Sequence, residues 1–226
     1  MARLNVVAEG STEESFVRIV LSPFLGELGV YTVARSVETR RVRGTIMRGG
    51  LKDYNKAKRD IVRWLKQDPS AFVTTMFDLY GLPSNFPGFD PADGVKPMGQ
   101  VEQLERALAA DIDYERFIPY IQIHEFESLL FSDVNAIDDE MSTSAARSRL
   151  AELRAVRVAF ETPEHINEGY ESCPSRRLSN IFPRYQKVTD GVRIASRIGI
   201  SRMREECRHF SAWIDQILDL ELTPTA

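Results

Sequence analysis

The sequence has few cysteines and histidines and no long apolar run. Its 226 residues include two cysteines and three histidines, too few for a disulfide framework, and Cys173 and Cys207 lack the CxxC spacing of a metal site. No apolar stretch approaches the roughly 20 residues that span a bilayer. The opening MARLNVVAEG reaches Glu9 after a short apolar stretch, unlike a signal peptide. We therefore expect a cytoplasmic protein without membrane association.

The motifs of several enzyme classes are also missing. The sequence contains no GxxxxGK[ST], GxGxxG, HExxH or GxSxG, which removes support for P-loop nucleotide hydrolysis, dinucleotide chemistry, zinc proteolysis and serine hydrolysis. It has no internal repeat and no low-complexity linker. With 43% hydrophobic and 27% charged residues, the composition is that of an ordinary globular protein with one principal core.

The formal charge of −4 gives no global sign of nucleic-acid binding, but the charges are strongly segregated. Residues 35–66 carry eleven Lys and Arg against three acids, and residues 68–140 carry fifteen acids against three bases. Residues 174–208 return to nine bases against three acids. Two basic segments therefore flank an acidic middle, so local rather than total charge decides which partners the chain can bind.

The hydrophobic pattern of the first 133 residues predicts an α/β fold. Short apolar, partly β-branched runs alternate with stretches of helical periodicity, which favours right-handed crossovers and a small parallel sheet flanked by helices. In the first helix we expect Ser11 or Thr12 as the cap and Phe16, Ile19 and Val20 on the inner face. The glycine-rich, basic segment 40–50 is expected to be a mobile connector. The expected strands are 4–8, 30–37, 71–77 and 117–123, and the expected helices between them are 11–25, 53–67 and 96–110.

Strand-like runs disappear after Asp133. The remaining pattern predicts helices, so we expect two parts, an α/β domain over residues 1–133 and a mostly helical C-terminal extension over 134–226 packed on it. The expected helices are 145–160, 175–182, 192–204 and 206–222.

Acids stand where three of the expected strands end. Glu9 follows the first strand, Asp78 follows the third, and Glu125 and Glu127 follow the fourth. Because open parallel sheets bind ligands outside the carboxyl ends of their strands, these side chains are expected to meet in one crevice. Clustered carboxylates repel one another unless a proton or a cation intervenes, and hard oxygen ligands suit Mg²⁺ or Mn²⁺ better than Zn²⁺.

Each acid taken singly also fits a structural role. Glu127, Glu13 and Glu14 are compatible with a solvated strand end or a helix cap, whereas Glu9 and Asp78 directly follow strongly apolar strands and precede loops, which favours function. His124 is compatible with a ligand or a base, although a lone histidine beside a strand is more often hydrogen-bonded structure.

Two groups of basic residues are candidates for contacts to a phosphate backbone. The alternative for both groups is a solvated surface, and Pro174-Ser175 with the two arginines that follow is equally compatible with a helix cap or an anion cradle. Arg184 and Lys187 belong to the second cationic cluster. The candidates for phosphate or nucleic-acid binding are Arg41, Arg43, Lys52, Lys56 and Arg59 in the first group and Arg176 and Arg177 in the second.

Several segments in order resemble a bacterial family of unknown function that is classed as TOPRIM-like. They are VAEGSTEESFV, MFDLYGLP, IQIHEFESLLFSD and PSRRL…FPRYQKVTDG…REECRHFSAW, and together they cover nearly the whole chain. The resemblance implies kinship with the TOPRIM domains of OLD-type nucleases and a small parallel sheet. It also implies a partner, because members commonly accompany an AAA-type or ABC-like ATPase in systems linked to phage defence.

Carried over by resemblance, Glu9 is the acid/base or metal-ligand glutamate, Asp78 is the first aspartate of a DxD pair, and Glu13 is the additional acid of an EGxxE pattern. Tyr80 stands where the second aspartate belongs, and Glu125 or Glu127 would restore the missing charge. The candidate metal ligands are therefore Glu9, Glu13, Asp78, Glu125 and Glu127.

Three hypotheses follow. The first is a Mg²⁺-dependent phosphodiesterase acting on DNA or RNA, with Glu9, Asp78 and Glu125 as its catalytic residues. The second is a non-catalytic adaptor or sensor subunit of an ATPase complex, which Tyr80 favours. The third, a phosphatase or nucleotidyl-transfer enzyme, would act on a small substrate. The sequence leaves open DNA against RNA, endonuclease against exonuclease, and the oligomeric state.

Overall fold

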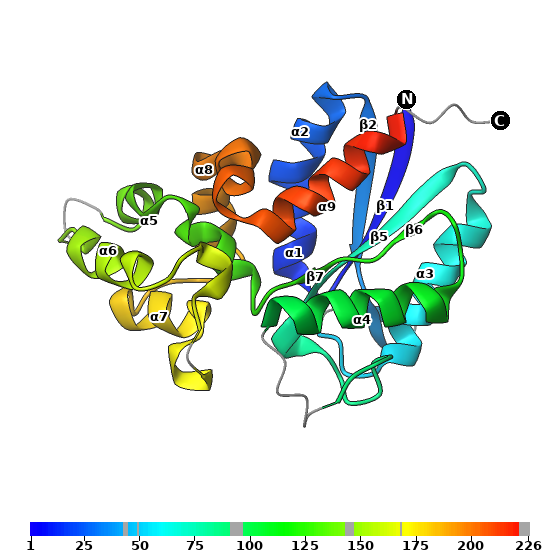
Figure 1. The fold of residues 1–226 in the computed structure, drawn as a ribbon, viewed down its shortest axis with the longest axis horizontal. Helices are drawn as coiled ribbons and strands as arrows, with labels where there is room; N and C mark the ends of the chain where they lie inside the picture. The colour runs from blue at the N-terminus through cyan, green and yellow to red at the C-terminus, as the bar shows by residue number, and fades with distance from the viewer. Residues whose placement is uncertain (43–44, 49, 91–96, 143–146, 168, 222–226) are drawn as a thin grey trace.

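The computed structural model describes residues 1–42, 45–48, 50–90, 97–142, 147–167 and 169–221. At its centre lies a sheet of parallel strands in the order β2-β1-β5-β6, with β7 pairing the end of β5. Figure 1 shows helices on both faces of this sheet and a helical lobe beside it. The fold confirms the predicted small parallel sheet flanked by helices. The strands are β1 (Ala2–Ala8), β2 (Val30–Ser36), β5 (Ala71–Asp78), β6 (Phe117–Ile118) and β7 (Ile121–Gln122).

The prediction of a single strand over residues 117–123 is wrong. Pro119 and Tyr120 separate two short strands, β6 and β7. Proline has no N–H for the ladder. Across the gap, the Thr75 hydroxyl accepts a hydrogen bond from the Tyr120 N–H (2.9 Å) and donates one to the Tyr120 carbonyl (2.8 Å). A buried side chain thus replaces the missing ladder bonds, and β7 still brings its carboxyl end beside Asp78.

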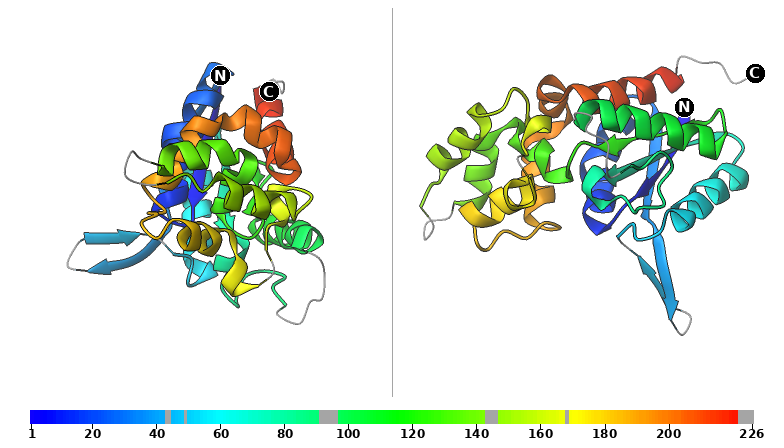
Figure 2. Two further views of the ribbon diagram at one scale, coloured as in Figure 1. Left: turned by 90° about the vertical axis from the view of Figure 1, so that its left-hand side faces the viewer. Right: turned by 60° about the horizontal axis from the view of Figure 1, so that its bottom comes forward.

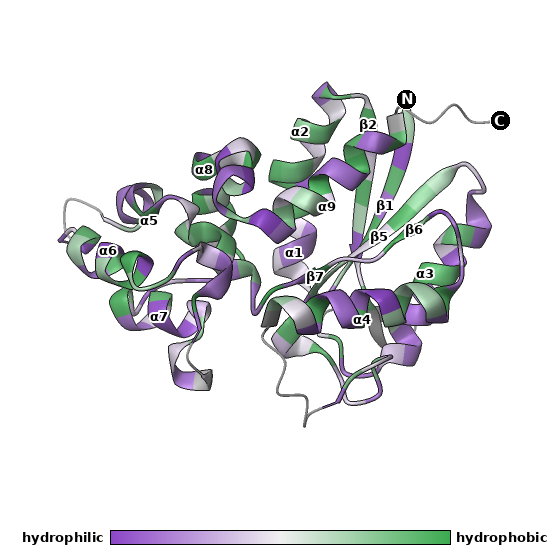
Figure 3. Cartoon of the chain, viewed as in Figure 1, coloured by the Kyte–Doolittle hydropathy of each residue, from purple (hydrophilic) through white to green (hydrophobic). Residues whose placement is uncertain are grey.

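Helices form a layer on each face of the sheet. The helices α1 (Ser11–Phe16), α2 (Ser22–Glu27) and α9 (Arg208–Leu218) cover one face, and α3 (Tyr54–Gln67) and α4 (Pro97–Ile112) cover the other. In Figure 3 the strand β5 between these layers is largely hydrophobic, as expected of a strand buried on both sides. The lobe consists of α5 (Val134–Met141), α6 (Leu150–Val158), α7 (Pro174–Ile181) and α8 (Asp190–Glu206). Among the 3₁₀ helices, Leu79–Gly81 follows β5 and Asp219–Glu221 follows α9, while Phe126–Ser132, Pro163–His165 and Tyr170–Ser172 lie along the chain between β7 and α7.

The first helix differs from the expectation at its start and on its inner face. Gly10, and not Ser11 or Thr12, is the N-cap residue, and its N–H donates to Glu13 Oε2 (2.9 Å). A π-helical turn, Val17–Leu21, then follows α1. Because this wider turn rotates the following residues, Leu21 is buried in the core while Ile19 is 50% exposed.

The segment between β2 and α3 is not a plain connector. It contains an antiparallel hairpin of β3 (Glu38–Val42) and β4 (Thr45–Arg48), with Arg41 opposite Ile46. Figure 2 shows the hairpin projecting away from the body of the molecule. The β-branched residues Thr39, Val42, Thr45 and Ile46 favour pairing of this basic segment as strands.

The C-terminal helices share a core with the sheet. The hydrophobic cluster on the α1 face includes Leu4 and Val6 of β1 together with Met203 of α8 and Trp213 of α9. The Trp213 indole N–H donates to Thr74 Oγ1 of β5 (2.9 Å), and its ring stacks on Tyr120 at 4.1 Å. The predicted boundary at residue 133 stays a prediction, and α9 lies against the sheet itself. In the described part of the chain, no helix has the length and apolar character needed to cross a membrane.

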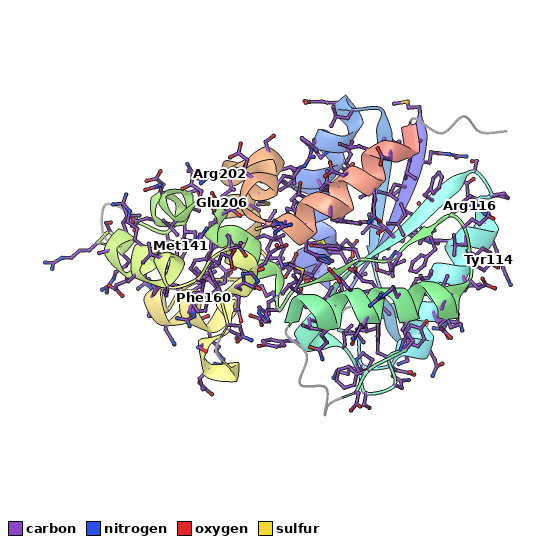
Figure 4. The ribbon with its side chains drawn as sticks, viewed as in Figure 1. Tyr114, Arg116, Met141, Phe160, Arg202 and Glu206 are labelled. Atoms are coloured by element: carbon purple, nitrogen blue, oxygen red, sulfur yellow. The ribbon has the colours of Figure 1, made fainter. Side chains whose placement is uncertain are left out.

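Arg116 fixes the edge of the sheet opposite the lobe. Its guanidinium donates to the carbonyls of Leu65 (3.3 Å), Asp68 (3.1 Å) and Ala71 (2.6 Å), which close the turn from α3 into β5. Figure 4 shows Arg116 near Tyr114 at this end, far from the lobe residues Met141, Phe160, Arg202 and Glu206. The Arg116 side chain therefore ties together the amino ends of the strands, and the acids gather at the carboxyl ends.

Candidate functional site

Four acids lie together at the carboxyl edge of the sheet, and we call them the acid cluster: Glu9, Glu13, Asp78 and Glu127. Glu9 follows β1 directly, Asp78 is the last residue of β5, and Glu127 lies in the 3₁₀ helix after β7. Glu13 comes from the first turn of α1. Glu127 is fully buried, and Glu13 and Asp78 are nearly so. The positions of these acids thus follow from the path of the chain as it leaves the carboxyl ends of the parallel strands.

Glu9 and Asp78 are held in contact through the backbone. The Asp78 N–H donates to Glu9 Oε2 (2.9 Å), and the Phe126 N–H donates to Asp78 Oδ1 (2.9 Å). Gly81 lies so close to the Glu9 carboxylate that a Cβ atom there would overlap it. Glycine at position 81 therefore leaves the space that the Glu9 carboxylate occupies.

Lys187, from the segment between α7 and α8, places its ammonium inside the acid cluster. The Lys187 Nζ atom is 2.9 Å from Glu127 Oε2 and 3.5 Å from Asp78 Oδ2. Burial alone would lower the pKa of Lys187, but the charges of Asp78 and Glu127 raise it above its usual value. Tyr185 also donates its hydroxyl to Glu127 Oε1 (3.4 Å). One lysine thus offsets part of the charge of four acids.

The acids hold their protons more tightly than exposed carboxylates. Burial raises the pKa of Glu9 to about 8, with the charge of Asp78 as the second cause, and raises the pKa of Glu13 and of Glu127 to about 7. Burial also raises the pKa of Asp78, although Lys187 opposes the shift. Burial thus disfavours the charged forms of these carboxylates, so a proton or a further cation would stabilise the cluster.

These raised pKa values predict that stability falls with pH. In the folded protein Glu9, Glu13 and Glu127 keep protons that the unfolded chain has released above about pH 5, so their contribution is lost as pH rises through about 7 to 8. The pKa of His209 is also raised, which acts in the same direction. We expect the melting temperature in EDTA to fall between about pH 6.5 and pH 8.5.

Calorimetry of the wild type and Glu9→Gln across that pH range measures this effect. The glutamine variant should lose less stability over the range, since one of the titrating groups is gone. Identical pH profiles for the two proteins would contradict a raised pKa at Glu9.

The acid cluster opens into a cavity of about 510 Å³, a volume in the range of small-ligand sites. Glu9, Asp78, Glu125 and Lys187 supply its charged wall. Tyr80, Gly81 and Cys173 complete the lining. The cavity lining therefore combines charged side chains with an aromatic ring and a thiol.

Glu125 reaches the cavity but is tied to helix α7. Its two carboxylate oxygens accept hydrogen bonds from the N–H and the hydroxyl of Ser175, each at 3.0 Å. Ser175 lies in the first turn of α7, where backbone N–H groups favour an anion. The anion bound by the predicted Pro174-Ser175 cradle is thus a carboxylate of the chain itself, and it joins the lobe to the sheet edge.

His124 is a buried residue next to Glu125 and is not part of the cavity lining. Its backbone has a φ of 63°, uncommon for a non-glycine residue and typical of strained positions near functional sites. Burial, together with the nearby His165, lowers the pKa of His124 to about 4, so the imidazole is neutral at physiological pH. Its Nδ1 atom is 3.3 Å from Asn167 Nδ2.

The basic candidates are dispersed. The segment before α3 passes near the site, because the Gly50 N–H donates to the Glu9 carbonyl (3.0 Å). Lys52 and Arg59 are exposed, and Lys56 is half-buried. Arg41 is described only in its backbone, and Arg43 lies outside the described residues.

The two arginines of α7 do not enter the acid cluster. Arg177 donates to the Ser172 carbonyl (2.6 Å), and its guanidinium lies 5.2 Å from the centre of the Phe160 ring. Arg176 is exposed on the helix surface. Among the described residues, Lys187 is the cation for which the structure gives ion pairs with Asp78 and Glu127. From the sequence, Lys187 was identified only as part of a cationic cluster. No local pattern indicates its ion pairs with acids that lie 60 or more positions earlier in the chain.

The acid cluster suits a hard divalent cation by its chemistry. Carboxylate oxygens are the preferred ligands of Mg²⁺ and Mn²⁺, and a bound cation would stabilise the charged forms of Glu9 and Glu13, which burial disfavours. In the described part of the chain, however, no group of three or more Asp, Glu, His or Cys side chains stands ready to hold a metal ion. The Lys187 ammonium lies between Asp78 and Glu127, so binding of an ion between those two acids requires this lysine to shift.

The chain belongs to the family described as domain of unknown function (DUF4276), whose sequence pattern matches residues 8–218. No curated protein matches it. Among solved structures, it is similar to the C-terminal region of the Burkholderia pseudomallei OLD protein, with 16% identity over 96% of this chain and 99% of that one and a TM-score of 0.43. It is also similar to the C-terminal region of the Xanthomonas campestris pv. campestris OLD protein, with 13% identity over 96% and 98% of the two chains and a TM-score of 0.40.

Proposed function

We propose that the protein is a Mg²⁺- or Mn²⁺-dependent phosphodiesterase that acts on nucleic acid. The observation that carries the proposal is the buried acid cluster at the carboxyl edge of the sheet, which opens into a cavity of about 510 Å³. Glu9 and Asp78 would hold the ion, with Glu13 and Glu127 behind them and Glu125 at the cavity wall. Such an ion activates water as a nucleophile and offsets charge on a phosphate.

The chain's own residues supply proton transfer and charge. Burial raises the pKa of Glu9 to about 8, so Glu9 would release a proton when it binds the ion. Lys187, rather than Arg176 or Arg177, presents a positive charge to a phosphate that enters the cavity. Lys52, Lys56 and Arg59 would contact the phosphate backbone outside it.

The TOPRIM-like assignment and the ATPase partner belong to the same proposal. They are supported by the ordered motifs from VAEGSTEESFV to REECRHFSAW. In a complex with an AAA-type or ABC-like ATPase, ATP hydrolysis would be the work of the second chain, because this sequence has no Walker motif. A role in phage defence is the setting that such pairs imply.

A second candidate function is a non-catalytic adaptor or sensor. Two observations favour it. Tyr80 stands where a second aspartate would be expected, and Lys187 already offsets charge in the acid cluster. An adaptor of this kind would keep the scaffold and its partner interface without metal-dependent cleavage.

Cleavage of supercoiled plasmid, linear DNA and total RNA in Mg²⁺, Mn²⁺ or EDTA separates the two candidates. We expect cleavage by the wild type with either metal, loss in EDTA, and loss in Glu9→Gln. Glu14→Gln is the matched control, because the Glu14 carboxylate binds the N–H and hydroxyl of Ser36 (2.9 and 2.7 Å) outside the cavity lining. Equal cleavage by all three proteins would indicate contamination. Absence of cleavage, also with the partner ATPase added, would favour the adaptor.

A further inference from the structure

Tyr80 is an exposed aromatic residue on the wall of the cavity that holds the acid cluster. It follows Asp78 by two residues, in the 3₁₀ helix Leu79–Gly81. Its side chain is 45% exposed, and it lines the same cavity as Glu9 and Asp78. Tyr80 thus places an aromatic ring beside the acids, at the position where the resemblance would have a second aspartate.

Contacts with His124 hold the Tyr80 ring in place. The Tyr80 N–H donates to the His124 carbonyl (3.2 Å), and the two rings lie 5.3 Å apart. Its chain neighbours Leu79 and Leu82 are buried. Among the described residues, the structure gives the Tyr80 hydroxyl no hydrogen-bond partner. The ring is therefore supported by the protein at its base, while its outer part stays open to a ligand.

The cavity lining contains the two kinds of group that a nucleotide requires. Glu9, Asp78 and Lys187 are charged groups suited to a cation and a phosphate, and Tyr80 adds an aromatic ring to the same lining. Nucleobases present flat faces that stack on aromatic side chains regardless of their identity. In a duplex those faces are already covered by neighbouring base pairs, so a base must be unpaired or flipped to reach such a ring.

We propose that Tyr80 determines substrate specificity by stacking on an unpaired base, so that the site takes single-stranded nucleic acid in preference to duplex. This inference rests on the proposed function and names its substrate class. The phosphate next to the stacked base faces Glu9 and Asp78. Where an aspartate at position 80 would supply a metal ligand, Tyr80 supplies a contact to the base.

Binding of a labelled single strand of about 12 nucleotides tests the inference, since such a length covers a typical single-strand site. Fluorescence anisotropy in EDTA, where cleavage is suppressed, gives the Kd for this strand and for the duplex of the same sequence. We expect tighter binding of the single strand by the wild type. Tyr80→Ala should raise that Kd about 5- to 150-fold, whereas Tyr80→Phe should bind as the wild type does.

Tyr31→Ala is the matched control, because Tyr31 is 57% exposed on strand β2 and is not part of the cavity lining. It should leave both Kd values unchanged. Equal affinity for single strand and duplex, no measurable binding of the single strand, or an unchanged Kd in Tyr80→Ala would each overturn the inference.

The inference and the proposed function fail in different ways. If the wild type cleaves nucleic acid with metal but Tyr80→Ala keeps the same ratio of single-strand to duplex cleavage, the inference is overturned and the function stands. If Tyr80-dependent binding of single strands occurs without cleavage under any metal condition, the inference stands and the phosphodiesterase proposal fails.

Discussion

Replacing Asp78 by asparagine is expected to reduce metal-dependent cleavage at least about 100-fold. Loss of a residue that only supports a metal ligand costs about 10- to 100-fold in activity, and Asp78 is proposed to hold the ion itself. The two side chains have nearly the same shape, so the amide oxygen can still accept the Phe126 N–H. What is lost is the negative charge beside Glu9 and Lys187. Because burial raises the pKa of Asp78, removing its charge relieves desolvation, and the fold should be retained.

Asp133→Asn provides the control for the Asp78 variant. Asp133 caps α5 by accepting from the Asn135 N–H (2.9 Å), and asparagine caps helices as well as aspartate does. Initial cleavage rates and circular dichroism are measured for both variants. Cleavage by Asp78→Asn within a few-fold of the wild type would remove Asp78 from the proposed chemistry.

Replacing Trp213 by alanine is expected to lower the free energy of unfolding by about 3–5 kcal/mol. The indole is 2% exposed, stacks on Tyr120 at an interplanar angle of 9° and lies 5.8 Å from the Phe210 ring. Its removal leaves a large cavity between α9 and the sheet and takes a hydrogen-bond partner from the Thr74 hydroxyl. The loss should therefore combine the burial of the indole, the cavity and an unsatisfied polar group.

The other tryptophan of the chain serves as the comparison. Trp64 lies half-buried on α3, with the Arg35 guanidinium 5.7 Å from its ring centre, so Trp64→Ala should cost only about 1 kcal/mol. Chemical denaturation of both variants gives the two values. Equal losses would mean that α9 does not lie against β5 as described.

The alternation of apolar runs and helical stretches was sufficient to predict the parallel sheet. Both β1 and β5 read as short apolar strands that end in an acid, and a parallel sheet brings such ends to one edge. The proximity of Glu9 and Asp78 therefore followed from the sequence. Their catalytic and metal-binding roles stay predictions.

Other features depend on contacts that no local pattern contains. Lys187 reaches the acids because the lobe folds back over the carboxyl edge, and Glu125 meets Ser175 for the same reason. The exposure of Ile19 follows from a π-helical turn, which keeps the hydrophobic residues but changes which of them face the core. Tertiary packing, rather than propensity, decides these positions.

Direct binding of Mn²⁺ is the measurement that tests the central claim, that the acid cluster is a site for a divalent cation. Electron paramagnetic resonance of Mn²⁺ titrated into the wild type and Asp78→Asn reports bound and free ion without requiring turnover. We expect saturable binding by the wild type that is lost or strongly weakened in Asp78→Asn and retained in Asp133→Asn. Absence of saturable binding by the wild type, or equal binding by all three proteins, would contradict the assignment.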